Sequence, residues 1–332
     1  MLAIKRFGDK NDSMNGSIII PVYNSELILE ELSSRLASAL PAIFSNFEVI
    51  MVNDGSRDQS WKVLTDLTSQ YPWIRAVNLM RNYGQHNALL CGIRLASYEV
   101  IVTMDDDLQH SPEEIYKLLE KLMEGYDVVY GTPYQETHSI WRNLASQITK
   151  LALQSTMGAE TARQVSAFRV FKTRIRDAFS TYQNSYVSID VLLTWGTTRF
   201  TAVYVPHNPR RKGQSNYTFR KLTIHALNMI TGFSIIPLQI ASLMGFASAV
   251  FGILVLAYVV GRYLIQGGVV PGFAFLASTI AIFSGVQLFA LGIIGEYLAR
   301  MHFRLMDRPP FVVQSDTSIK HDQQIMQEMG HE

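Results

Sequence analysis

The sequence has almost no cysteine and no charge excess. Cys91 is the only cysteine among 332 residues, which excludes an intramolecular disulfide framework and fits a reducing compartment. The 29 basic and 28 acidic residues leave a net charge of +1, so nothing global indicates a nucleic-acid partner. Residues 1–16 are polar and lack the apolar core of a signal peptide, so we expect the first half of the chain to stay in the cytosol.

Charged residues are also scarce, at 17% of the chain, and the mean hydropathy is +0.10. Residues 233–261 and 267–295 contain none. Each run exceeds the ~20 residues needed to cross a hydrocarbon core, so they predict a hairpin of transmembrane helices at 233–262 and 268–297. Basic residues lie before the first run and after the second, with only Arg262 between them. This bias places both ends of the hairpin in the cytosol. The alternative is a pair of buried core helices.

From residue 17 to residue 131, short runs rich in Ile and Val alternate with amphipathic helical segments. The expected strands cover residues 17–23, 47–53, 74–79, 99–104 and 127–131. The first helical segment, 26–40, carries leucine at every third or fourth position along one face. This alternation predicts an α/β domain with a mostly parallel sheet covered by helices on both faces.

Three consecutive carboxylates, Asp105, Asp106 and Asp107, follow the fourth expected strand. We expect the next helix to begin with a capping box formed by Ser111 and Glu114. Ligands of α/β proteins bind at the carboxyl ends of the strands, and carboxylates there suit Mg²⁺ or Mn²⁺ carrying a phosphate. The alternative is a solvated acidic turn.

Polar residues also follow the first two expected strands. Pro21, Tyr23 and Glu26 lie at the end of the first, and the sequence Asp54-Gly55-Ser56 lies at the end of the second. Because parallel strands end at one edge of the sheet, these residues can line the same crevice as the acidic triplet. Asp54 can accept the imide N–H of a uracil, and Tyr23 can stack on its ring. Residues 54–56 alone would indicate only a strand-to-helix turn, but together with the triplet they favour a nucleotide site.

Two other segments, 140–157 and 217–230, are amphipathic at helical spacing. Each could lie in a membrane interface, and the first could instead be a surface helix packed on the sheet. The second directly precedes an apolar run, which favours the interfacial interpretation for it.

Several motifs carry a resemblance to a known family: SIIIPVYNSE, VNDGSRD, RNYGQHNALLCGI, DDDLQHSPEEI and GIIGEYLAR. They resemble the polyprenyl-phosphate glycosyltransferases of glycosyltransferase family 2, which have a GT-A catalytic domain and include dolichyl-phosphate mannose synthases and bacterial undecaprenyl-phosphate sugar transferases. The resemblance covers residues 17–310. RNYGQH and EGYDVV are similar to the undecaprenyl-phosphate 4-deoxy-4-formamido-arabinose transferases.

The resemblance implies a GT-A (Rossmann-like) cytosolic domain joined to a two-helix transmembrane hairpin with interfacial amphipathic helices. The expected parts are an N-terminal tail at 1–16, a catalytic domain at 17–216 with an interfacial helix at 138–157, a juxtamembrane helix at 217–232, transmembrane helices at 233–262 and 268–297, and a polar cytosolic tail at 298–332.

The resemblance also implies a donor site. The nucleoside would be held by Pro21, Tyr23, Glu26 and Asp54, with Arg81 and Asn82 bordering its pocket. Asp107 would bind Mg²⁺ or Mn²⁺, Asp105 would lie near the ribose or the metal, and Gln109 would line the sugar or diphosphate site.

The basic loop of the family appears at residues 210–217, where Asn216 stands in place of the usual Lys. Arg210 is the best candidate for gripping phosphate, since a planar bidentate donor serves well there, and Ser215 lies in the same loop. Alternatively, Arg210 is a juxtamembrane charge that binds anionic lipid.

One position departs from the family. Residues 165–169 read V-S-A-F-R, where many relatives have T-G-D-F-R, and Ala167 replaces an Asp viewed as a catalytic base. Either the chain is an inactive relative, or no base is needed. A phosphate monoester has a second pKa of ~6 and is mostly dianionic at neutral pH, which favours the second interpretation. Ser166 could donate a hydrogen bond, and Arg169 could grip phosphate or stabilise the loop.

We therefore expect an inverting, metal-dependent transferase that moves a sugar from a nucleotide-sugar, most simply a UDP-sugar, to undecaprenyl phosphate. It would act at the cytosolic face of a bacterial inner membrane, in cell-envelope glycan or lipopolysaccharide modification. Asp105, Asp107 and Arg210 are the expected catalytic residues. The main rival is an inactive scaffold or lipid-carrier-binding protein. A processive polysaccharide synthase is disfavoured because no Q-x-x-R-W motif is present. The Gly, Ala and Ser of the hairpin are compatible with a homo-oligomer.

Overall fold

The computed structural model describes residues 14–133, 164–184, 187–208, 236–266, 272–306 and 308–318. The chain divides into two compact units, Met1–Tyr217 with Arg308–Glu332, and Thr218–Asp307. The helices predicted at 138–157 and 217–232 lie outside the described residues.

Eight strands of the first unit form one sheet in the order β7-β5-β6-β4-β1-β2-β3-β8. Their bounds are β1 Asn15–Val22, β2 Asn46–Asn53, β3 Ile74–Leu79, β4 Val100–Thr103, β5 Val128–Pro133, β6 Arg169–Lys172, β7 Phe200–Val205 and β8 Val313–Asp316. Strands β1 to β4 run parallel to one another, and β5 runs parallel to β7. Only β6 and β8 are antiparallel to the strands beside them. The prediction of a mostly parallel sheet is confirmed.

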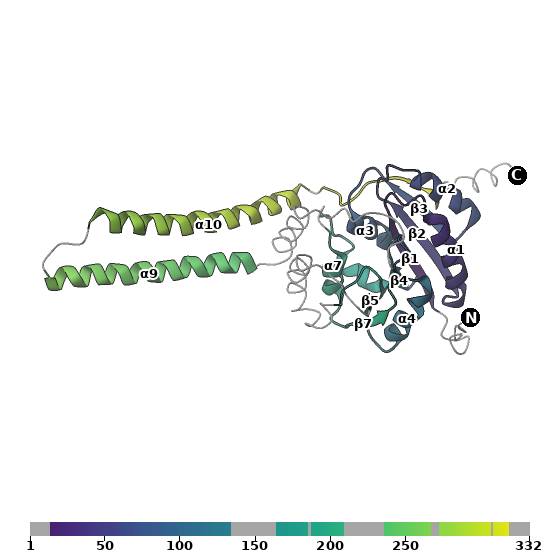
Figure 1. Ribbon diagram of the computed structural model, residues 1–332, viewed down its shortest axis with the longest axis horizontal. Coiled ribbons are helices and arrows are strands. Elements are labelled where there is room, and N and C mark those ends of the chain that lie inside the picture. Colours follow the sequence, from purple (N-terminus) through teal and green to yellow (C-terminus); the bar gives the residue numbers. More distant parts are fainter. Residues whose placement is uncertain are drawn as a thin grey trace. The chain divides into compact units, whose positions relative to one another are not determined.

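Helices cover both faces of this sheet, as the apolar strands require (Figure 1). Among the described residues of this unit, the helices are α1 Leu29–Ala39, α2 Ser60–Gln70, α3 Gln85–Leu95, α4 Ile115–Met123 and α7 Ile189–Gly196, with short 3-10 turns η1 Leu40–Ala42, η2 Pro112–Glu114 and η3 Thr173–Phe179. One core joins α1, α2 and α4 to the side chains of Ile18, Ile20 and Val22 in β1. The leucine stripe predicted for α1 is buried in that core.

Helix α3 covers the opposite face, and Gly92 sets how closely it approaches the sheet. A Cβ atom at Gly92 would lie 2.3 Å from Cγ2 of Ile19 and 3.4 Å from Cγ2 of Val52. Both of these side chains are buried. Glycine therefore allows α3 to lie directly on β1 and β2, whose carboxyl ends carry the candidate site.

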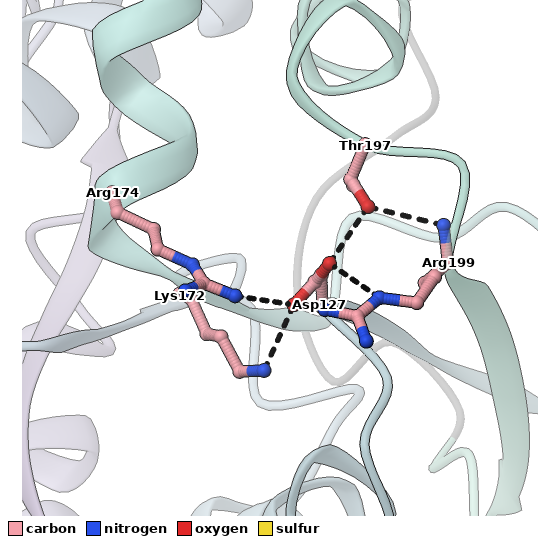
Figure 2. A network of polar contacts seen from close by, with 5 residues as sticks. All are labelled: Asp127, Lys172, Arg174, Thr197 and Arg199. Carbon is pink, nitrogen blue, oxygen red and sulfur yellow. Dashed lines mark hydrogen bonds and ion pairs between the residues drawn. The ribbon is translucent and has the colours of Figure 1, made fainter.

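At the opposite, amino-terminal edge of the sheet, Asp127 joins three strands (Figure 2). Its carboxylate accepts hydrogen bonds from Lys172 Nζ at 2.8 Å, from Thr197 Oγ1 at 2.8 Å, and from Nε and Nη2 of Arg199 at 3.0 and 3.1 Å. Arg174 Nη2 lies 3.2 Å from the same group. Burial raises the pKa of Asp127, but these hydrogen bonds outweigh burial and hold the pKa well below its usual range. The network fixes the start of β5 to the end of β6 and the start of β7.

The second unit contains two long helices, α9 Ile236–Gln266 and α10 Phe273–Leu305. They pack against each other, with the rings of Phe251 and Phe283 6.4 Å apart, and a Cβ at Gly252 would lie only 3.0 Å from Cζ of Phe283. Within them, Pro237–Ile265 and Ile282–His302 are long and apolar enough to cross a membrane. This agrees with the predicted hairpin, although α10 extends eight residues past the expected end at 297.

Two details of the prediction are wrong. The segment after residue 313 was expected to be a polar tail, but Val313–Asp316 is strand β8. The capping box of Ser111 and Glu114 does not form: Ser111 Oγ accepts a hydrogen bond from Arg35 Nη2 at 3.1 Å, and Glu114 pairs with Lys117. In both cases a tertiary contact decides the local structure.

Candidate active site

The first two loops at the carboxyl edge of the sheet are hydrogen-bonded to each other. Asn24, which follows β1, has a positive φ of 54°. Its N–H donates to Ser56 Oγ at 3.0 Å, and its Oδ1 accepts from the Arg57 N–H at 2.8 Å. The side chain of Glu26 accepts from the Gln59 N–H at 2.7 Å, just before α2. Tyr23 is 40% exposed between these contacts, so its ring is available for stacking.

Asp54, the residue after β2, is buried and holds the next loop. Its Oδ1 accepts the N–H of Tyr83 at 2.7 Å, and its Oδ2 accepts the N–H of Gly84 at 2.9 Å. Burial raises the pKa of this carboxyl, and the two backbone hydrogen bonds oppose that change. Both carboxylate oxygens of Asp54 therefore hold the loop at residues 81–84 in place.

That loop crosses very close to Gly55. Gly55 has a φ of +63°, and a Cβ there would lie 2.5 Å from the carbonyl carbon of Arg81 and 2.5 Å from the nitrogen of Asn82. The side chains of Arg81 and Asn82 are exposed, and the Arg81 guanidinium lies 4.4 Å from the ring centre of Tyr83. Both residues predicted to border the nucleotide are thus held at the edge where β1 and β2 end.

The acidic triplet divides into an inner and two outer carboxylates. Asp106 Oδ2 accepts hydrogen bonds from Ser25 Oγ and, at 3.4 Å, from the Tyr23 N–H, and burial raises its pKa to about 6. Asp106 therefore joins the end of β4 to the loop after β1. Asp105 accepts from Gln85 Nε2 at 2.6 Å, and Asp107 accepts from the N–H of Gln109 at 3.1 Å.

Leu108 shapes the turn that presents these acids. It has a φ of 57°, a left-handed conformation that costs a residue with a Cβ on the order of 1 kcal/mol. Its side chain is 2% exposed, so core packing offsets that cost. No pattern in the sequence indicates a left-handed leucine.

The donor set at this turn fits a hard divalent cation. Over the described ranges of the chain, no group of three or more His, Cys, Asp and Glu side chains could hold a metal. Asp105 and Asp107 would therefore supply one or two carboxylate oxygens, and water and phosphate would supply the rest. Mg²⁺ is bound in this way in many phosphate sites.

The segment containing Ala167 is fixed to β4. Thr103 Oγ1 donates to the carbonyl oxygen of Ala167 at 2.8 Å, and Ser166 Oγ accepts the N–H of Phe168 at 3.2 Å. Ala167 therefore lies beside the strand that ends in the acidic triplet, where the family Asp would stand.

Arg169 is 1% exposed. Its Nε donates to Thr103 Oγ1 at 3.0 Å, and its Nη1 pairs with Asp190 of α7. Tyr130 also donates to Asp190, at 3.1 Å. Of the two roles predicted for Arg169, these contacts support stabilisation of the loop.

Two histidines without metal-ligand spacing connect the acidic turn to the end of β7. The ring of His110 stacks on Phe168 with centroids 5.1 Å apart. The rings of His110 and His207 are edge to face, with centroids 5.0 Å apart. Burial lowers the pKa of His110 to about 4, so the imidazole is neutral. The carbonyl oxygen of Gln109 accepts the N–H of Asn208 at 2.8 Å. Arg210 and Ser215, predicted for the acceptor side, lie outside the described residues.

This edge thus gathers Pro21, near the end of β1, and residues on the four loops that follow β1 to β4: Tyr23, Glu26, Asp54, Arg81, Asn82, Asp105, Asp107 and Gln109. Residues 17–183 match the model of the family described as Glycosyl transferase family 2. The chain belongs to glycosyltransferase family 2. It is 34% identical to an uncharacterized glycosyltransferase of Synechocystis sp. over 301 residues, which are 90% of this chain and 94% of that one.

A second relative agrees with this family assignment, and a solved structure shares the fold. It is 34% identical to the undecaprenyl-phosphate 4-deoxy-4-formamido-L-arabinose transferase of Pseudomonas savastanoi pv. phaseolicola, over 90% of this chain and 89% of the relative. The fold is similar to glucosyl-3-phosphoglycerate synthase from Mycobacterium tuberculosis, solved with Mn²⁺ and UDP, at a TM-score of 0.50 and 15% identity, covering 66% of this chain and 78% of that one. The predicted GT-A fold and transferase class are confirmed.

Proposed function

We propose that this glycosyltransferase moves a sugar from a UDP-sugar to undecaprenyl phosphate. The observation that carries the proposal is the pair of outer carboxylates, Asp105 and Asp107, on a strained turn whose middle residue, Asp106, is hydrogen-bonded to the loop of the exposed Tyr23. Similarity to transferases named for undecaprenyl phosphate over 89–95% of their length supports the acceptor. Helices α9 and α10 are the part of the chain that would hold the enzyme at the inner membrane where that lipid lies.

In the donor complex, Tyr23 would stack on the uracil, and Pro21 and Glu26 would form the wall behind it. Asp54 would keep Arg81 and Asn82 at the pocket, and a remaining lone pair of its carboxylate could accept the imide N–H. Asp107, with Asp105, would hold Mg²⁺ or Mn²⁺, which when bound neutralises the charge of the departing diphosphate. Gln109 would face the sugar or the diphosphate.

In the transfer step, an oxygen of the lipid phosphate would attack the anomeric carbon as the bond to UDP breaks. One displacement inverts the anomeric configuration. The acceptor has a second pKa of ~6 and is mostly dianionic at pH 7. The transfer therefore needs no general base, and a site with Ala167 in place of Asp can still carry it out. What the chain must supply is positioning and charge neutralisation, and Arg210 and Ser215 are our candidates on the acceptor side.

Ala167 also motivates a second candidate, an inactive relative that binds the lipid carrier. A screen of UDP-glucose, UDP-N-acetylglucosamine and UDP-linked formamido-arabinose with undecaprenyl phosphate and Mn²⁺, read as UDP release, separates the two. We expect UDP release with one of these donors, and we expect that release to stop when a chelator removes the Mn²⁺. Absence of release with every donor, together with retained lipid binding, would support the second candidate.

A further inference from the structure

Strand β8 completes the sheet after the chain has left helix α10. Asp316 pairs with Val77 of β3, Ser315 with Asn78, and Val313 with Leu79. Beyond the strand, the N–H of Met80 donates to the carbonyl oxygen of Val312 at 3.0 Å. The segment that follows the apolar hairpin therefore covers the edge strand that leads into the loop at residues 81–84.

An ion pair fixes the register of β8. Nε and Nη2 of Arg75 donate to Oδ1 and Oδ2 of Asp316 at 3.1 and 2.5 Å, and the Asp316 side chain is 6% exposed. Thr317 Oγ1 accepts the N–H of Ala76 at 3.0 Å. Burial raises the pKa of Asp316, but the hydrogen bonds from Arg75 and Ser318 outweigh burial, so the pKa is lowered. Because a shift of one residue would turn every side chain to the other face, this bidentate pair specifies one alignment.

A row of side-chain amides then runs from β8 to the donor site. Asn78 Nδ2 donates to Gln314 Oε1 at 3.0 Å, and Asn53 Nδ2 donates to Asn78 Oδ1 at 2.7 Å. Asn53 is 2% exposed and directly precedes Asp54, which holds the N–H groups of Tyr83 and Gly84. We call Gln314, Asn78 and Asn53 the amide ladder.

We propose that β8 is a positioning element of the donor site. Through the amide ladder and the Arg75–Asp316 pair it holds β3, and with it the loop of Arg81 and Asn82, in the arrangement that binds the nucleotide. The inference rests on the UDP-sugar donor proposed above. It makes the segment downstream of the hairpin a working part of the catalytic domain, with Gln314 and Asp316 acting through β3 rather than by touching the donor.

The physical reason is preorganisation. An edge strand without a partner opens locally at lower free energy than a paired one, and the loop that follows it opens with it. A nucleotide must then order that loop on binding, and the cost of ordering lowers its affinity. The acceptor candidates Arg210 and Ser215 follow β7 in the sequence, and β7 and β8 are the two edge strands at opposite ends of the sheet order. The KM for the lipid acceptor should therefore not change.

The test measures UDP binding to the full chain in detergent with Mn²⁺ by calorimetry, together with the melting temperature. The variants are Asp316→Ala and the milder, surface Gln314→Ala. Asp127→Ala is the matched control, because Asp127 is a similarly buried carboxylate, 7% exposed, that also accepts a bidentate arginine. It lies at the start of β5, at the amino-terminal edge of the sheet and not at the carboxyl edge that carries the donor site.

We expect both Asp variants to melt at lower temperature, and only the β8 variants to raise the Kd for UDP, by about three- to tenfold. The KM for undecaprenyl phosphate should stay at the wild-type value. Wild-type Kd values in both β8 variants would overturn the inference, as would an equal rise in Asp127→Ala. If the wild-type chain itself binds no UDP, the proposed function fails instead, which the same titration reveals.

Discussion

Arg169 offers the sharpest test of how the acceptor side is built. Its guanidinium is 1% exposed and pairs with Asp190, whose side chain is 14% exposed. Arg169→Met keeps most of the side-chain volume but leaves the Asp190 carboxylate without its cation. Removing one partner of a buried ion pair costs about 3–5 kcal/mol. Since 1 kcal/mol corresponds to about 2–4 °C in a domain of this size, we expect the melting temperature to fall by about 10 °C.

The assay is thermal unfolding of Arg169→Met, Asp190→Leu and the double variant. Removing both charges leaves no uncompensated ion, so the double variant should melt above Arg169→Met. Arg174→Met is the control: this arginine also meets a carboxylate but is 66% exposed, and its loss should change stability by less than about 1 kcal/mol. If Arg169→Met melts like the wild type yet loses turnover, the guanidinium serves the substrate and the stabilising role assigned to it is wrong.

Three other changes give distinct outcomes. Gly92→Ala would place a methyl group 2.3 Å from Ile19 Cγ2, and we expect a loss of about 1–3 kcal/mol of unfolding free energy in denaturant melts; an unchanged midpoint would contradict the packing described. Asp127 has a lowered pKa in the folded state, so its stabilisation is present above about pH 4 and is lost as the pH falls below that. The difference in melting temperature between wild type and Asp127→Asn should therefore shrink below pH 4, and a difference that grows there would refute the network's role. Ala167→Asp should leave the transfer rate at pH 7 within about twofold, because a dianionic acceptor needs no base; a large gain in rate would show that the departure from the family was misread.

Much of the fold follows from local sequence pattern. The apolar runs of β1 to β5 and the leucine stripe of α1 were predictable because burial on two faces, or on one, leaves a period in the sequence. The hairpin was predictable because two charge-free runs leave few alternatives. The carboxyl edge followed from the order of parallel strands, which brings Tyr23, Asp54 and Asp107 to one side of the sheet.

What could not be predicted depends on contacts between residues far apart in the chain. Ser25 binds Asp106 across 81 positions, and Arg75 binds Asp316 across 241. Neither pairing has a sequence period, and the β8 segment is as polar as a mobile tail. The left-handed φ of Leu108 is imposed by burial of its side chain, so it becomes visible only when the core is known.

In the proposed site, the outer carboxylates of the triplet, Asp105 and Asp107, hold the metal and the diphosphate. The most direct measurement compares Mn²⁺-dependent UDP release by Asp107→Ala, by the wild type, and by Asp66→Ala, which removes an exposed carboxylate of α2. We expect Asp107→Ala to lose metal-dependent turnover at an unchanged melting temperature, with Asp66→Ala as active as the wild type. Turnover by Asp107→Ala close to the wild-type rate would contradict the site.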